Sequence, residues 1–194
     1  VSVHAGSSDA EDGGAITMQA GLANKGGHGG DFTMSAGASG SGVGGAMKII
    51  GGAGPAASGD VLVSSSNSVS QSGNVKVTTG EASRGDSGGM YLMTGQADGR
   101  AGDMRISAGA GDASGGDLLL ESGGSAVAKG GAVVIASGEA ESDSGRIAVI
   151  SGDSVRGTAG SVEIGVGKSL HAASVGGDFT AFAGDAATLG GAVS

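Results

Sequence analysis

The stretch from Gly130 to Gly138 contains a unit that the rest of the chain repeats. It reads Gly-Gly-Ala-Val-Val-Ile-Ala-Ser-Gly, and closely similar units occupy residues 29–37 and 115–123. In each unit, apolar residues alternate over five or six positions and glycines stand at both borders. Alternation with a period of two is typical of a β-strand, and bordering glycine is typical of a turn. This repeat constrains the fold more than any other feature of the sequence.

The first apolar residue of the unit recurs along the whole chain at intervals of 14 to 17 residues. Its positions are Val1, Ile16, Phe32, Met47, Val61, Val75, Met90, Met104, Leu118, Val133, Ile147, Val162, Phe179 and Val193. A fixed period of this length indicates stacked coils rather than a globular core.

Fifteen residues at about 3.3 Å per residue are enough for two short strands and two tight turns. We therefore predict an all-β fold in a single repeat-built domain over residues 1–194. It would be a right-handed parallel β-solenoid, a flattened two-sheet β-helix of about 13 coils of 14–17 residues. Because the sequence opens and stops inside a unit, we expect this domain to be uncapped at both ends, either cut from a longer array or stacked end to end.

The two strands of each coil are unequal. The facing strand is weakly marked and falls in small-residue segments at 68–70, 110–112, 126–128, 154–156 and 186–188. The third inward position of the strong strand is also small in most units, as in Ala36, Gly51 and Ser137. We expect small residues here because the two layers must approach closely, and we expect glycine pairs to supply the positive φ of sharp corners.

Composition and charge exclude several functions. The formal net charge is -9 and no basic stripe is present, which argues against nucleic-acid binding. No apolar run reaches the roughly 18–20 residues of a membrane span. The sequence has 45 Gly, one Pro and no Cys, so disulfides are ruled out.

Two motifs look catalytic or cofactor-binding but lack the context that their chemistry needs. The string Gly85 to Gly89 matches the nucleophile region of chymotrypsin-like proteases, yet His4, His28 and His171 have no useful spacing relative to it. Gly40 to Gly45 satisfies G-x-G-x-x-G, but no helical pattern follows. We predict that the protein is not an enzyme and has no catalytic or cofactor-binding residues.

Calcium is the one cofactor with some support in the sequence. Six units carry Asx just after the border glycine, at Asp31, Asp60, Asn74, Asp103, Asp117 and Asp178. Calcium-binding β-rolls place carboxylates at successive turns. Their aspartate and apolar residues are spaced differently, so the favoured interpretation is an Asx turn that satisfies backbone amides, without a metal site.

Ice binding is a further alternative, because several antifreeze proteins are flat solenoids of small residues. Their mechanism requires a regular outward array of threonines. The residues that alternate with the inward apolar positions form the outward rows. Here these rows begin with Thr17 and Thr33 but are interrupted by Lys48, Lys76 and Arg105.

Large apolar residues on the same outward rows form a broken patch. We predict that they mediate self-association, because contiguous exposed apolar area usually marks a contact site. The candidate residues are Ile50, Leu62, Tyr91, Met93, Leu119, Val134, Ile150 and Phe182.

In its units at 29–37 and 130–138, the chain resembles the large Gly/Ser-rich tandem-repeat surface proteins of algae and other protists, and repeat segments of fibrous adhesins. The resemblance implies an extracellular or cell-surface location, a structural or adhesive role and no specific site residues. We therefore expect a subunit of an extracellular fibre or surface layer that assembles by end-to-end β-stacking and lateral apolar contact, with itself as partner. The alternative is a binding module for ice, calcium or glycan. No Asn-x-Ser/Thr sequon occurs, so any glycan modification would be on Ser or Thr.

Overall fold

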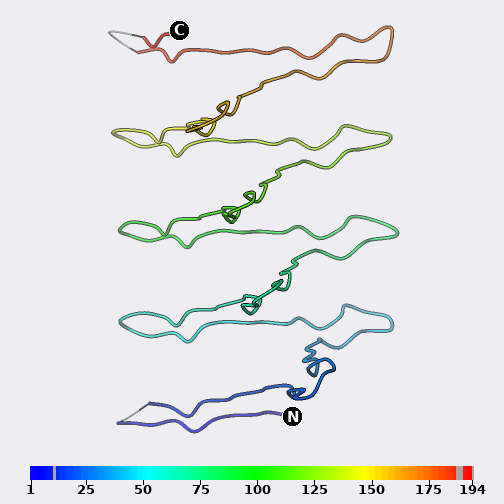
Figure 1. The fold of residues 1–194 in the computed structure, drawn as a ribbon, viewed down its shortest axis with the longest axis vertical. Helices are drawn as coiled ribbons and strands as arrows, with labels where there is room; N and C mark the ends of the chain where they lie inside the picture. The colour runs from blue at the N-terminus through cyan, green and yellow to red at the C-terminus, as the bar shows by residue number, and fades with distance from the viewer. Residues whose placement is uncertain (11, 187–189, 194) are drawn as a thin grey trace. The chain divides into compact units, whose positions relative to one another are not determined.

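The computed structural model describes residues 1–10, 12–186 and 190–193. The chain divides into two units, Val1–Met93 and Thr94–Ser194. Within each unit, extended runs alternate with loops that reverse the chain direction (Figure 1). Over the described residues there is neither a helix nor a strand. The predicted β-solenoid, or β-helix, is therefore wrong as the fold of this single chain.

The loops nevertheless follow the period of the sequence repeat. The backbone bends at residues 9–10, 24–27, 40–42, 55–56, 69–70, 83–85, 98–99, 112–113, 126–128, 141–143, 155–157 and 171–173. Successive bends are about 15 residues apart, and one extended apolar run lies between each pair. Each sequence unit therefore forms one extended run and one loop.

A hydrogen bond between two glycines closes most of the loops, and we call this contact the glycine clasp. The N–H of the second glycine donates to the C=O of the first at 2.8–3.2 Å. The nine donor and acceptor pairs are Gly14 and Gly6, Gly30 and Gly21, Gly45 and Gly37, Gly59 and Gly52, Gly116 and Gly109, Gly131 and Gly123, Gly145 and Gly138, Gly160 and Gly152, and Gly191 and Gly184.

The two glycines of a clasp have different steric surroundings. A Cβ added to the donor Gly145 would lie 3.2 Å from the Cβ of Ser137 and 3.4 Å from the backbone nitrogen of Gly138. A Cβ added to the acceptor Gly138 would meet nothing within 4 Å. The donor is therefore glycine because the two chain segments approach closely, whereas the acceptor position has room for a side chain.

The small third position of the apolar run has the same cause. Ala5, Ala20, Ala36, Ala108, Ser122, Ser137, Ser151 and Ala183 each face the donor glycine of their own loop, with 3.2–3.6 Å between their Cβ and the Cβ that the glycine lacks. We expected this position to be small because a second sheet faced it. The structure shows instead that it faces the closing glycine of the following loop.

Among the described residues, four loops lack the clasp, and in three of them the third position is β-branched. The third-position residues are Thr79, Thr94 and Val166 in those three loops, and Ser65 in the fourth, where Ser66 replaces the acceptor glycine. Opposite Thr94, a Cβ on Gly102 would lie 4.0 Å from the nearest threonine carbons, further than in the clasped loops. At Thr94 the wider separation accompanies a branched side chain, whereas the loop after Ser65 lacks the clasp without one.

This comparison predicts that Thr94→Ser closes its loop, since Gly95 and Gly102 already supply the acceptor and the donor. The new hydrogen bond should stabilise the loop by about 1 kcal/mol. Amide hydrogen exchange measures the effect, with about fivefold slower exchange expected at Gly102. Thr94→Val, which keeps the branch, is the matched control and should leave the exchange rate unchanged. Equal rates in Thr94→Ser and the parent protein would contradict the steric explanation.

The predicted facing strand is also wrong, because its segments lie at loop tips. Ser125 and Ser154 accept hydrogen bonds on Oγ from the backbone amides of Ala128 and Gly157, both at 2.9 Å. These contacts turn the chain locally and leave Val127 and Val155 almost fully exposed. Residues 187 and 188 of the last expected segment lie outside the described residues.

Positive φ contributes less than we expected from the number of glycines. Over the described residues it occurs only at Gly26, Gly27 and Gly85, in the bends at 24–27 and 83–85. The donor glycines of the clasps are therefore needed for close approach rather than for a left-handed backbone.

No side chain in the described part of the chain is buried. Ala20, Gly51, Ser65 and Ser151 are partly covered, and all four occupy the third position of an apolar run. The loops therefore provide local closure, but neither unit has a hydrophobic core of its own.

Candidate self-association surface

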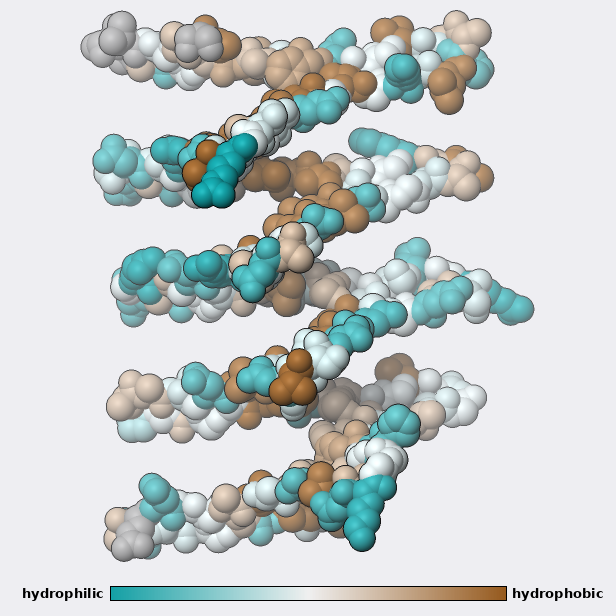
Figure 2. Space-filling model, in the orientation of Figure 1, coloured by the Kyte–Doolittle hydropathy of each residue, from teal (hydrophilic) through white to brown (hydrophobic). Residues whose placement is uncertain are grey.

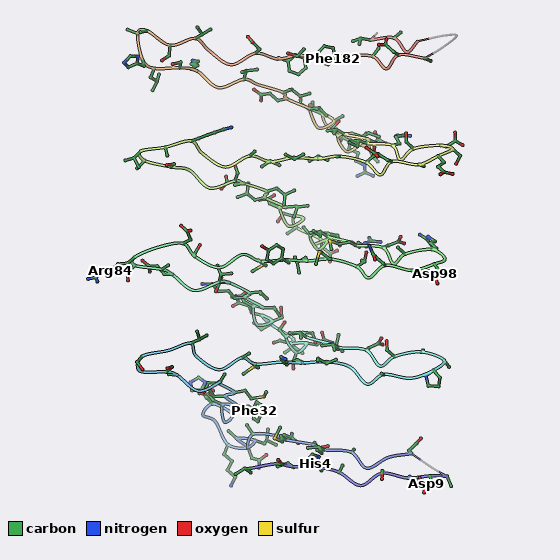
Figure 3. All side chains as sticks on the ribbon, turned by 180° about the vertical axis from the view of Figure 1, so that it is seen from behind. His4, Asp9, Phe32, Arg84, Asp98 and Phe182 are labelled. Carbon is green, nitrogen blue, oxygen red and sulfur yellow. The ribbon has the colours of Figure 1, made fainter. Side chains whose placement is uncertain are left out.

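The eight predicted self-association residues are all strongly exposed, between 74% for Leu119 and 88% for Phe182. They lie on extended runs, where apolar surface gathers, whereas many loop ends are hydrophilic (Figure 2). Phe182 is seen on its run in the view of all side chains (Figure 3). The ring of Tyr91 bends back over the backbone, 3.1 Å from where a Cβ on Gly89 would stand.

The two faces of an extended run differ in exposure. Leu118, Leu119 and Leu120 are 55%, 74% and 66% exposed, and Val133, Val134 and Ile135 follow the same order. The first and third residues of each triplet are therefore somewhat less exposed than the middle residue. The inward and outward rows of the sequence are thus distinct faces of the run, and both remain largely accessible to solvent.

The accessible surface of the chain is far too large for a folded monomer. It amounts to 19391 Å² for 17.9 kDa. A compact protein of this mass exposes roughly 8,000 Å², and its fully unfolded chain roughly 26,000 Å². The loops alone therefore remove only a minor part of the surface that a stable fold must bury.

The backbone of the extended runs is unpaired as well. Every backbone hydrogen bond found in the described residues lies within a single loop, and none joins one run to another. Extended backbone with free N–H and C=O groups templates pairing with a further strand. Open backbone groups and exposed apolar side chains thus occur together on the same segments.

Potential metal ligands do not converge. The described residues contain no group of three or more His, Cys, Asp and Glu side chains able to hold a metal ion. Of the six Asx residues after the border glycine, Asp103 is the only one with a side-chain hydrogen bond in the described chain. It accepts two from the Arg100 guanidinium at 2.8 and 2.9 Å. The expected Asx turns are therefore not seen.

The Arg100–Asp103 ion pair should contribute little to stability, because both side chains are highly exposed. Such pairs are typically worth less than about 1 kcal/mol. We expect Arg100→Ala to shift the thermal midpoint of the protein by no more than about 2 °C in calorimetry. A larger loss that disappears in 0.5 M salt would show that the pair has a structural role.

The two motifs that look catalytic can be compared with the hydrogen bonds of the described residues. In the described structure the hydrogen bonds made by a histidine side chain stay within residues 171–174, and none reaches Ser87, the serine of the protease-like string. A contact that the sequence pattern does not indicate joins His171 Nδ1 and Ser174 Oγ at 3.4 Å. It belongs to the turn at 171–173, where His171 Nδ1 also accepts a hydrogen bond from the Ala173 amide at 3.3 Å. No carboxylate orients this histidine in the described residues, so we assign the pair to the turn.

An open depression occurs in the loop that follows Thr94. Gln96, Ala97, Asp98 and Ala101 line it, and Asp98 lies at the projecting end of this loop (Figure 3). The depression lies in a loop that lacks the clasp.

No family model, curated protein or solved structure matches this chain. In the described residues, no helix has the length and apolar character to cross a membrane.

Proposed function

We propose that this protein is a structural subunit that associates with copies of itself to build an extracellular fibre or surface layer. The observation that carries the proposal is the accessible surface of 19391 Å², more than twice that of a compact monomer of the same mass. A chain without a core must bury this surface against another molecule to become stable.

A second copy of the chain is the partner that fits best. The excess over a compact monomer is roughly 11,000 Å² per chain, well beyond the 2,000–5,000 Å² of ordinary obligate interfaces. A partner must therefore follow the chain along its length. Another copy carries the same run and loop at the same spacing, so contacts made by one unit can be repeated by all others.

The backbone and the side chains of the extended runs both support a second copy as the partner. Free backbone groups can hydrogen-bond to the runs of another copy, and apolar side chains can then pack in the interior of the assembly. The hydrophilic loop ends would remain outside, and the net charge of -9 would limit unspecific aggregation. The extracellular setting rests on the resemblance of the units to Gly/Ser-rich surface proteins.

Sedimentation over a 1,000-fold concentration range, followed in parallel by far-UV circular dichroism, tests the proposal. We expect oligomers at high concentration, with loss of ordered secondary structure when dilution releases monomers. Electron microscopy of the concentrated sample should show elongated particles or layers. A monomer that keeps a cooperative thermal transition at all concentrations would overturn the proposal.

A further inference from the structure

Within the unit Thr94–Ser194, the loops point in three directions that recur after every third repeat. Loops 95–102 and 138–145 extend to one side, and loops 123–131 and 166–177 extend to the opposite side (Figure 1). Loops 109–116 and 152–160 point toward the viewer in the same orientation (Figure 2). One turn of this unit therefore comprises three repeats, with one loop at each corner.

Successive turns of this unit do not touch along their extended runs. Open space separates them in the space-filling view (Figure 2), and no backbone hydrogen bond joins them in the described chain. The runs above and below a given opening carry free backbone groups and exposed apolar side chains, among them Leu119 and Ile164. Each opening is thus lined by surface that is suited to further extended runs.

We propose that three copies of this chain wind their units Thr94–Ser194 around one common axis, with the runs of two copies filling the openings between the turns of the third. This inference rests on the proposed self-association. It commits to three copies because closed oligomers are rotationally symmetric. For the runs of different copies to lie over one another, the rotation that relates the copies must place the corners of one copy over the corners of the next. In a turn with three corners, a threefold rotation does this, whereas a twofold or fourfold rotation does not.

The symmetry also determines which repeats become neighbours. Rotating a copy by one third of a turn moves it forward by one repeat, so a run lies beside the preceding repeat of one neighbour and the following repeat of the other. Leu119 of one copy is then adjacent to Val134 of another copy. Residues about 15 apart in sequence are therefore stacked between chains, at the spacing of about 4.8 Å typical of paired strands.

Engineered cysteines test this register, and the absence of native cysteine removes any background. The test variant combines Leu119→Cys with Val134→Cys. Paired runs place these Cα atoms within the 4.4–6.8 Å that a disulfide needs. The control combines Leu119→Cys with Glu163→Cys, the equivalent position three repeats later. In the proposed coil these residues are about 14 Å apart on one face, which is too far for a disulfide.

The full-length variants are oxidised in dilute solution and run on a denaturing gel without reductant, alongside sedimentation of the parent protein. We expect a covalent trimer for the test variant, monomer for the control and a trimer for the parent. A covalent dimer or a ladder of multimers would overturn the threefold arrangement while leaving self-association intact. A disulfide within one chain, or a control that cross-links as efficiently, would overturn the register. A parent protein that is monomeric throughout would refute the proposed function itself.

Discussion

Two aspartates on one extended run should abolish assembly, whereas two aspartates at loop tips should leave it intact. In the first variant, Val133→Asp and Ile135→Asp place charges in a run that the proposed assembly buries. In the second, Val127→Asp and Val155→Asp place them at tips that are 97% and 98% exposed. Both variants change two valine or isoleucine residues and add two negative charges, so net charge does not distinguish them.

The expected difference is large because an unpaired buried charge costs several kcal/mol. The variant with charged runs should need at least a hundredfold higher concentration to assemble, which sedimentation equilibrium measures. The tip variant should assemble like the parent protein. Equal loss of assembly in both variants would show that the interface includes the loop tips. Equal retention would show that the apolar runs are not buried by association.

Four clasps altered together should lower the stability of the assembled protein substantially. The variant replaces the donor glycines Gly14, Gly131, Gly145 and Gly160 by alanine. At these positions an added Cβ would lie 3.2–3.3 Å from the Cβ of the opposing small residue. Overpacking of this kind typically costs about 1 kcal/mol or more at each site, and distant sites add. We therefore expect a total loss of about 4 kcal/mol, seen as a lower denaturant midpoint.

The acceptor glycines of the same four loops provide the matched control. Replacing Gly6, Gly123, Gly138 and Gly152 by alanine introduces the same four methyl groups where nothing lies within 4 Å. This control should be neutral or slightly stabilising, because alanine restricts the unfolded chain more than glycine does. If the two quadruple variants have equal denaturant midpoints, close approach of the two segments is not the reason that the donor position is glycine.

The repeat could be recognised from sequence because local geometry follows local residues. Each bend falls between apolar runs such as 61–63 and 75–77, and the glycines on either side of a bend are visible in the printed sequence. Serine at the tips was a readable signal too, since Ser125 and Ser154 are turn-forming residues. The same segments also fit the second strand of a two-sided coil, which is why the pattern alone favours a strand there.

The role of the third position could not be assigned from sequence. A small residue at Ser137 is compatible with packing against a second sheet and equally with close approach of the donor glycine of its own loop. Both arrangements give the same sequence pattern. The difference depends on whether Gly145 returns to Ser137 in its own loop, which is a contact between residues eight apart. The loop after Thr94 lacks the clasp, which supports the interpretation that the third position is small because it faces the donor glycine.

The sequence alone determined the period and the two faces of each apolar run, because these depend on residues within one repeat. Only the tertiary structure decided that, in the described residues, one repeat does not pair with the next repeat of the same chain. Stacking depends on free energy gained between distant segments, and an alternating pattern such as Val133-Val134-Ile135 is equally suited to a partner in its own chain or in another.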